Sequence, residues 1–562
     1  MMKKIMTFYD KYLKNSIGLG FLIAISTVLG YMLDKKQQTF RSLPELGWIL
    51  FLTAILTILT SFVIRFLLKG MTKLRDGQIR TRIGQKEYGN RQVFFFYSSV
   101  IFLCWLPVFL AYYPSVFAYD AEGQLYQVLA HDYSTHHPLI HTLFLGAFFR
   151  LGGSVFGSYS AGMALHSIVQ MLLMAMIFGY ALMVLYKERT SYIMRLLLLA
   201  FYALFPTNSV LAMSTTKDVL FSGLVLLYVI KMYEWSRQDD GAEHEKRWFR
   251  VTLCIISVLM LLFRNNAVYA YVVSLPLVFF FWKRDEKTKQ ATGHGWTKKD
   301  TKAVCFILGT LVLFLICSAG LKQITAAHNG SPREMLSVPL QQMARARVEH
   351  EEELENDMRE ELDLYLPSEW VFAAYNPHLA DPVKNRAVIH DNPVGLLKTW
   401  MKLGLKFPMT YVDAFLDNAI GYWYLADTSH AEIYGVGTES GFGYLSTDNR
   451  TMPAGCEIIE NSYLPGLRVF MEKMISDNAY QKIPVLSVIF APAFYWWLLC
   501  LYMVFFFQRR EYRMLLPVLF LVVYYLTLLL SPTVLIRYMY PFVVCVPMML
   551  CLISGRKEKT EK

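Results

Sequence analysis

Long, uninterrupted blocks of apolar residues separated by polar linkers dominate this chain of 562 residues. Continuous apolar runs are typical of membrane-spanning helices, whereas helices on a soluble core alternate apolar and polar faces. Several blocks are shorter than the roughly 20 residues that a span needs, so we expect their helices to continue into polar flanks or to end at a cavity. The pattern predicts about 12 transmembrane helices, over residues 16–33, 47–68, 93–111, 160–185, 193–213, 219–232, 251–263, 267–282, 303–321, 485–507, 514–530 and 539–554.

One long polar stretch interrupts this pattern, at residues 322–484. The chain therefore divides into a membrane domain over residues 1–321 with nine spans, a mostly helical soluble insertion over 322–484, and a membrane domain over 485–562 with three spans and a tail. The first apolar block has no small-residue cleavage site behind it, so we interpret it as a retained helix and not as a signal peptide.

Composition supports a polytopic α-helical membrane protein. The chain is 55% hydrophobic and 18% charged, with a mean hydropathy of +0.34, whereas soluble proteins carry about a quarter charged residues. Of the eight cysteines only Cys456 lies in the insertion, so the sequence predicts no disulfide framework there.

Positive charge indicates which side of the membrane each segment faces, because Lys and Arg stay preferentially in the cytoplasm. The basic linkers 69–91, 283–302 and 508–513 and the C-terminal tail all fall on the cytoplasmic side if the chain starts there. The insertion has a net charge of −9 against +11 for the whole chain, and so faces outward. The basic excess is thus topological and does not indicate nucleic acid as a partner. Loop 34–45, with Lys35, Lys36 and Arg41, is the exception.

The outer loop after the third span carries two carboxylates, Asp120 and Glu122, followed by a half-apolar segment and the turn His136-His137-Pro138. A second apolar segment, 139–151, comes next, a pattern that suits short helices on the membrane surface. Charged groups at the membrane are often functional. The alternative is a solvated loop with a capping aspartate.

The histidines of this loop leave three interpretations open. His137 and His141 have the four-residue spacing that lets two imidazoles on one helix face chelate a metal, but no HExxH motif or cysteine pair accompanies them. Contact with a phosphate or sugar hydroxyl, and simple burial, are the other two.

Cations occur at three further outer positions. Lys217-Asp218 opens the sixth span, Arg264-Asn265 separates two short apolar blocks, and Arg537-Tyr538 joins the last two spans. Thr215 with Asp218 fits a variant of the capping box, while a lysine beside a helix N-terminus suits an anion. Either arginine could be a snorkelling anchor, but positive charge on the outer side opposes the topological preference. We expect Arg264 and Arg537 to converge on one phosphate pocket.

Taken together, the elements Tyr119-Asp120…Gln124, His137-Pro138, Thr216-Lys217-Asp218, Arg264-Asn265 and Arg537-Tyr538 resemble an uncharacterised bacterial branch of the C-type (GT-C) superfamily of polyprenol-dependent membrane glycosyltransferases. The resemblance spans residues 93–554. It implies a cell-envelope transferase that moves a sugar from a polyprenyl-phosphate donor to an extracytoplasmic glycan, lipid or protein.

The resemblance also implies roles for individual residues. Asp120 would be the catalytic base or a metal carboxylate, with Glu122 as the second candidate. Lys217, Arg264 and Arg537 would bind phosphate. The full set of implied substrate contacts is His136, His137, Lys217, Asp218, Arg264, Asn265, Arg537 and Tyr538. The first loop lacks a paired acidic dipeptide and the soluble domain precedes the last three spans, so dependence on a divalent cation, Mg²⁺ or Mn²⁺, stays open.

A transporter or flippase for the same lipid-linked glycans is the rival class. It would hold phosphate with the same cations but would also need charges inside the inner half of the membrane. Arg65 and Arg195 lie near the cytoplasmic ends of their spans, where snorkelling explains them, and the chain has no internal repeat of the kind common in transporters.

Overall fold

The computed structural model describes residues 16–77, 88–237, 243–289, 298–389, 392–427, 452–453, 455–476 and 479–555. Every regular element in these ranges is a helix. The part before the insertion forms α2 (Ile17–Lys36), α3 (Leu43–Arg75), α4 (Asn90–Ala111), α5 (Tyr119–Ala130), α6 (Leu139–Val155), α7 (Tyr159–Lys187), α8 (Tyr192–Leu204), α9 (Pro206–Ala212), α10 (Asp218–Ser236), α11 (Glu243–Phe263), α12 (Ala267–Lys289) and α13 (Lys298–Thr325).

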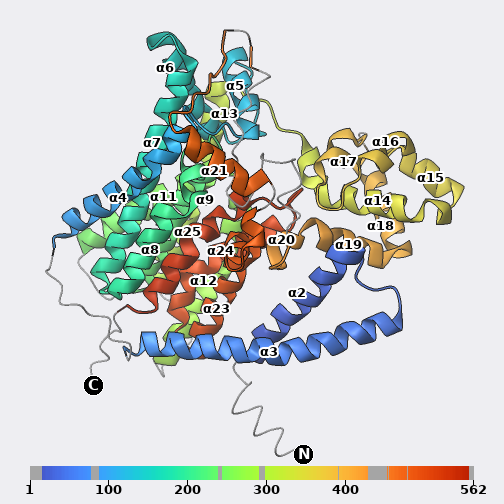
Figure 1. Ribbon diagram of the computed structural model, residues 1–562, viewed down its shortest axis with the longest axis horizontal. Coiled ribbons are helices and arrows are strands. Elements are labelled where there is room, and N and C mark those ends of the chain that lie inside the picture. The colour runs from blue at the N-terminus through green and yellow to red at the C-terminus, as the bar shows by residue number, and fades with distance from the viewer. Residues whose placement is uncertain are drawn as a thin grey trace, which may run out of the picture.

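The remaining helices belong to the insertion and to the last part of the chain (Figure 1). The insertion contains η2 (Pro332–Leu336), α14 (Ser337–His350), η3 (Glu351–Glu353), α15 (Asn356–Asp363), α16 (Ser368–Ala374), α17 (Asp381–Arg386), α18 (Pro393–Lys406), α19 (Pro408–Asn418), α20 (Ile420–Trp423), α21 (Pro465–Ser476) and η5 (Ala479–Lys482). The last part forms α22 (Leu486–Phe490), α23 (Pro492–Gln508), η6 (Tyr512–Val518), α24 (Leu519–Leu528) and α25 (Ile536–Leu552).

Six helices in the described part of the chain are long and apolar enough to cross a membrane: α2, α3, α4, α7, α10 and residues 304–325 of α13. The pair α8 and α9 makes a seventh if it counts as one span, bent by 51° where Pro206 removes a backbone donor. Five further apolar helices or helix pairs are shorter. The protein therefore has the make-up of a helical membrane protein, and the count of about 12 spans stays a prediction.

Each of the twelve predicted apolar blocks coincides with a helix or a bent helix pair. The short blocks do extend into polar flanks, since α11 begins at Glu243 and α12 continues to Lys289. The segment 139–151 forms α6, which packs tightly along α7. A Cβ on Gly152 would lie 2.7 Å from the Gly162 backbone, so only glycine permits this approach. The position of α6 on the membrane surface stays a prediction.

The core of the bundle surrounds α10 and α25, which are almost entirely buried. Polar side chains within it donate to backbone carbonyls: the Trp105 indole reaches Tyr202 at 3.1 Å, and the Tyr202 hydroxyl reaches Val544 at 2.7 Å. These hydrogen bonds join α4, α8 and α25 where no water could replace them.

The insertion has an apolar core of its own, built from side chains between Leu340 and Tyr411, and its helices α14–α18 gather to one side of the bundle (Figure 1). The charged run 349–363 does not form one continuous helix. Leu354 is buried with an extended backbone between η3 and α15. The chain leaves the helix to place that apolar side chain in the core. Residues 428–451 of the insertion lie outside the described ranges.

Loop 37–42, the exception to the charge rule, is held by the insertion. The Thr39 amide and hydroxyl both donate to Asp413 of α19, at 3.2 and 2.6 Å, and the Arg41 guanidinium donates to the same carboxylate at 2.6 Å. Arg41 also lies 3.6 Å from Glu349. The acidic insertion thus neutralises the positive charge of this loop, and both lie on the same side of the bundle.

The basic linkers also meet. Arg75 lies 2.7 Å from Glu511, and Arg509 lies 3.1 Å from Asp76, so the linkers after α3 and α23 share one end of the bundle. Several predicted cytoplasmic charges, namely Arg80, Arg82, Lys86, Arg556, Lys557 and Lys559, and both chain termini lie outside the described residues.

We expect Asp413→Asn to destabilise the protein by about 1–3 kcal/mol, because the buried Asp413 oxygens accept three hydrogen bonds that an amide cannot all replace. The measurement is the melting temperature of the full chain in detergent. Asp357→Asn, at an exposed position of α15, is the matched control and should change little. Equal melting temperatures for the two variants would show that the hydrogen bonds of loop 37–42 to Asp413 do not stabilise the protein.

Candidate functional site

Five charged side chains from four helix ends meet in one place, which we call the charge cluster. Asp120 stands in the first turn of α5, Lys217 and Asp218 stand at the start of α10, Arg264 follows the last residue of α11, and Arg537 stands in the first turn of α25. Far apart in the sequence, they become neighbours because these helix ends lie at one end of the bundle.

Hydrogen bonds to the backbone between α9 and α10 fix the position of Lys217 and Asp218. The buried Gln170 amide donates to the carbonyls of Ala212 at 3.0 Å and Ser214 at 2.7 Å, and the Ser115 hydroxyl donates to Met213 at 2.9 Å. The buried Gln170 side chain thus supplies the hydrogen bonds that these backbone carbonyls lack between the two helices.

The capping-box interpretation of Thr215 with Asp218 is wrong. Lys217 occupies the N-cap position of α10, and no side chain caps the helix. The Thr215 hydroxyl instead accepts a 2.8 Å hydrogen bond from the Ala118 amide, just before α5. The bond ties the start of α5 to the start of α10, so Thr215 helps to hold Asp120 beside Lys217.

The ion pairs of the cluster form a continuous network. Lys217 Nζ lies 2.5 Å and Arg537 Nη1 lies 2.9 Å from the same Asp120 oxygen. Arg537 Nη1 also lies 3.5 Å from Asp218, which forms a second ion pair with Arg264. The two arginines thus converge on Asp218, and their guanidinium groups lie 4.7 and 4.9 Å from the centre of the Tyr538 ring.

The cluster has three cations against two carboxylates, so its formal charge is +1 when all five are ionised. The Asp218 side chain is 1% exposed and the Asp120 side chain is 16% exposed. Burial alone would raise the pKa of Asp120, but Lys217 and Arg537 outweigh it and hold the pKa well below its usual range. Burial, with help from Arg537, lowers the pKa of Lys217.

His137 borders the cluster. Its Nδ1 lies 3.4 Å from Lys217 Nζ. Burial first and the charge of Lys217 second lower the pKa of His137 to about 3. The imidazole is therefore neutral at physiological pH, and its Nδ1 can accept a hydrogen bond from the ammonium group.

Other predicted site residues stand outside the ion pairs of the cluster, which join Asp120 and Asp218 to Lys217, Arg264 and Arg537. Glu122 is half-buried further along α5, and the ion pairs of the cluster run through Asp120 and Asp218. His136 is exposed and packs edge-on against His137, with ring centres 4.5 Å apart. The Asn265 amide donates to the backbone carbonyl of Thr135 at 3.1 Å. Asn265 thus supports the histidine turn, and does so from the exposed side.

A divalent cation does not fit the charge cluster. Among the described residues no group of three or more His, Cys, Asp or Glu side chains gathers with metal-binding geometry. Each cluster carboxylate is already neutralised by two cations, and Lys217 and Arg537 would repel a metal ion at Asp120. His141, the other candidate ligand, is buried and its Nδ1 lies 2.8 Å from the Gln124 amide oxygen.

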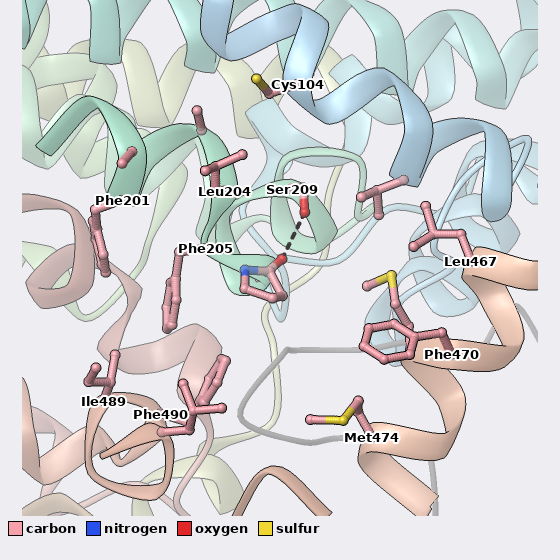
Figure 2. Close-up of a pocket in the computed structure, with 16 residues that line it drawn as sticks. Cys104, Phe201, Leu204, Phe205, Ser209, Leu467, Phe470, Met474, Ile489 and Phe490 are labelled. Carbon is pink, nitrogen blue, oxygen red and sulfur yellow. Dashed lines mark hydrogen bonds between the residues drawn. The ribbon is translucent and has the colours of Figure 1, made fainter. Parts of the chain in front are cut away.

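An apolar groove of about 640 Å³ opens beside α9, the helix that leads to Lys217 (Figure 2). The labelled side chains in Figure 2 come from α4, from the bend between α8 and α9, and from α21 and α22, and they project into one space. Sequence reasoning missed this groove. The signal for its near wall was Pro206 in the middle of an apolar block, which predicts a bend, whereas nothing local to Phe470 or Met474 indicated that α21 would form the far wall.

Sequence reasoning also missed the groups that hold Arg264. Its Nε donates to Asn266 Oδ1 at 3.0 Å, and its guanidinium lies 5.7 Å from the rings of both Phe221 and Tyr524. An aromatic enclosure of this kind favours a cation over a neutral side chain.

Comparison with known proteins identifies one related group. A family model described as "Family of unknown function (DUF6020)" matches residues 130–562. The match includes Lys217, Asp218, Arg264 and Arg537 but begins after Asp120. Searches among curated proteins and among solved structures give no match.

We expect Asp218→Asn to destabilise the protein by about 3–5 kcal/mol, because it leaves the buried Arg264 without its ion-pair partner. The double variant Asp218→Asn/Arg264→Gln should recover part of this loss, since it removes both charges. Asp120→Asn should cost less, because Asp120 is more exposed and Arg537 keeps Asp218 as a partner. Melting temperatures of the four proteins in detergent test the order, and a double variant less stable than Asp218→Asn would contradict it.

Proposed function

The chain belongs to the DUF6020 family, whose function is unknown, and we propose from its charge cluster that it is a membrane glycosyltransferase of the GT-C type. The sugar would come from a polyprenyl-phosphate donor, and the acceptor would be an extracytoplasmic glycan, lipid or protein of the cell envelope. The observation that carries this proposal is the contact of one partly exposed carboxylate, Asp120, with two cations, Lys217 and Arg537.

The reaction needs two kinds of group that the cluster supplies. The bond between the sugar C1 and the phosphate oxygen breaks, and the leaving polyprenyl phosphate gains negative charge that Lys217, Arg264 and Arg537 can stabilise. A new bond forms between C1 and the acceptor oxygen, whose proton passes to Asp120. The net charge of +1 in the absence of substrate suits an incoming anion.

The low pKa of Asp120 makes it a weak base as long as both cations contact it. A donor phosphate that binds Lys217 and Arg537 would compete for these ion pairs. Asp120 would then lose the charges that depress its pKa, and burial would raise the pKa instead. Donor binding would thus prepare the base, so that the proton is accepted only when a donor is present.

The apolar groove supports a lipid-linked donor. Its lining is apolar except for Ser209, whose hydroxyl already donates to the Pro206 carbonyl at 3.0 Å. Ser209 and Lys217 are joined by a short segment that is tightly held by Gln170. An isoprenoid chain in the groove would therefore lie near the cations that hold its phosphate.

A transporter or flippase for lipid-linked glycans is the second candidate, and one observation favours it. At the other end of α10, Lys231 pairs with Glu234 at 2.7 Å and donates to the Tyr180 hydroxyl at 3.1 Å. Ionisable side chains in the inner half of a span are what a transporter would need in addition to the outer cations. A transfer assay in vesicles separates the two, since a flippase would move donor across the bilayer without transferring sugar.

We expect Asp120→Asn to reduce sugar transfer by about 10²-fold or more, because it removes the group that accepts the proton. The assay is transfer from a labelled polyprenyl-phosphate sugar by the purified chain in vesicles. Asp132→Asn, at an exposed position just after α5, is the matched control. Normal transfer by Asp120→Asn with loss in Glu122→Gln would move the role to Glu122, and normal transfer by both would reject the site.

The proposed location is the cell membrane, with both termini in the cytoplasm and the insertion outside. Cysteines introduced at Glu352 and Asp357, both exposed, should react with an impermeant thiol reagent in intact cells. Native Cys456 is only half-buried against Tyr159 and should be removed first. Labelling that requires lysis would reverse the topology and place the charge cluster on the cytoplasmic side.

A further inference from the structure

Helix α18 of the insertion has two apolar faces. Leu396 and Leu403 turn into the insertion core. On the opposite face, Val394, Leu397, Met401 and Leu405 are between 46% and 85% exposed. Their spacing of three, four and four residues places them in one continuous stripe along the helix. A surface that faces only water rarely carries four large apolar side chains in line.

Three lysines border this stripe on one side. Lys398, Lys402 and Lys406 are exposed and follow each other at four-residue intervals. Lys402 lies 2.5 Å from Glu361, and Lys406 lies 3.7 Å from Glu355. An apolar stripe with a basic edge is typical of helices that lie in a membrane interface, with the lysines near lipid phosphates.

The position of α18 agrees with this chemistry. Helix α19, which follows α18 directly, packs against α2, and its Leu416 packs against an apolar cluster that includes Leu33 near the end of α2. Loop 37–42, which joins the membrane-capable helices α2 and α3, is bonded to Asp413 of α19. The membrane surface must pass close to this loop. Figure 1 shows α18 and α19 along the edge of the insertion that faces α2 and α3.

We propose that α18 is an interfacial anchor, with Val394, Leu397, Met401 and Leu405 among the acyl chains of the adjacent leaflet and the lysines at anionic headgroups. A second copy of the chain is a poorer occupant, because four side chains bury far less than the roughly 800 Å² per partner of a stable interface. The anchor is independent of the glycosyltransferase proposal, because it concerns only where the insertion rests.

The test measures the depth of single nitroxide labels on the full chain in vesicles that contain phosphatidylglycerol, with the native cysteines replaced. Depth is read from the ratio of the label's collision rate with oxygen, which concentrates in lipid, to its collision rate with a water-soluble nickel reagent. This ratio should be several-fold higher for labels at Leu397, Met401 or Leu405 than for a label at Leu364. Leu364 is a comparably exposed apolar residue just after α15 and does not belong to the stripe on α18. Equal ratios at all four sites would overturn the proposal.

Two further arms distinguish lipid from a second copy of the chain as the occupant of the stripe. The double variant Leu397→Gln/Met401→Gln should move a label at Leu405 into water, whereas Leu364→Gln should not. An unchanged Leu405 label would overturn the proposal.

A second experiment tests for a second copy of the chain on the stripe. Dipolar broadening between Met401 labels that disappears on dilution with unlabelled protein would show such a copy, and would also overturn the proposal. Replacing phosphatidylglycerol by a zwitterionic lipid should make all three stripe labels shallower.

Discussion

The requirement that buried charges be paired governs this structure. Asp218 and Arg264 are almost fully buried, and an unpaired charge in such a place would cost several kcal/mol. Their pairing, and the second contact of Asp218 with Arg537, require that the ends of α10, α11 and α25 lie together. The bundle is thus organised around one carboxylate that two arginines share, and Asp120 with Lys217 extends the same network to a more exposed position.

Much of the architecture was accessible from the sequence because continuous apolar runs specify helices that water does not solvate. The cluster residues stood out for a related reason: isolated charges such as Arg264 and Arg537, placed beside apolar blocks, need partners. The sequence could not predict which carboxylate pairs with which cation, because the pairing depends on how helices far apart in the sequence approach one another. The apolar groove was missed for the same reason, since its two walls, at Phe205 and Phe470, are far apart in the chain. The helical break at Leu354 could not be read from local propensity either, because burial of one apolar side chain outweighs the helical propensity of its charged neighbours.

The insertion is more than an appended domain. Its turn at Leu379 and Ala380 pairs with the backbone of Pro532 and Thr533, and the Tyr422 hydroxyl donates to the Thr533 carbonyl at 3.1 Å. Arg537 follows this loop by four residues. The loop before Arg537 is therefore fixed by hydrogen bonds to the insertion. A movement of the insertion would shift this loop and with it the position of Arg537 in the cluster. The same insertion clasps loop 37–42, and it joins the first and last parts of the membrane bundle.

This tie between Ala380 and Pro532 has a consequence for biosynthesis. Roughly 150 residues separate the two partners, and a ribosome that adds about 5–20 residues per second needs on the order of 10–30 s to make them. During that interval Asp120 and Asp218 have been synthesised but Arg537 has not, and Ala380 of the insertion has no Pro532 to pair with. The charge cluster is complete only once α25 has been made, so a chain that stops before Arg537 carries Asp120 and Asp218 without one of their cations.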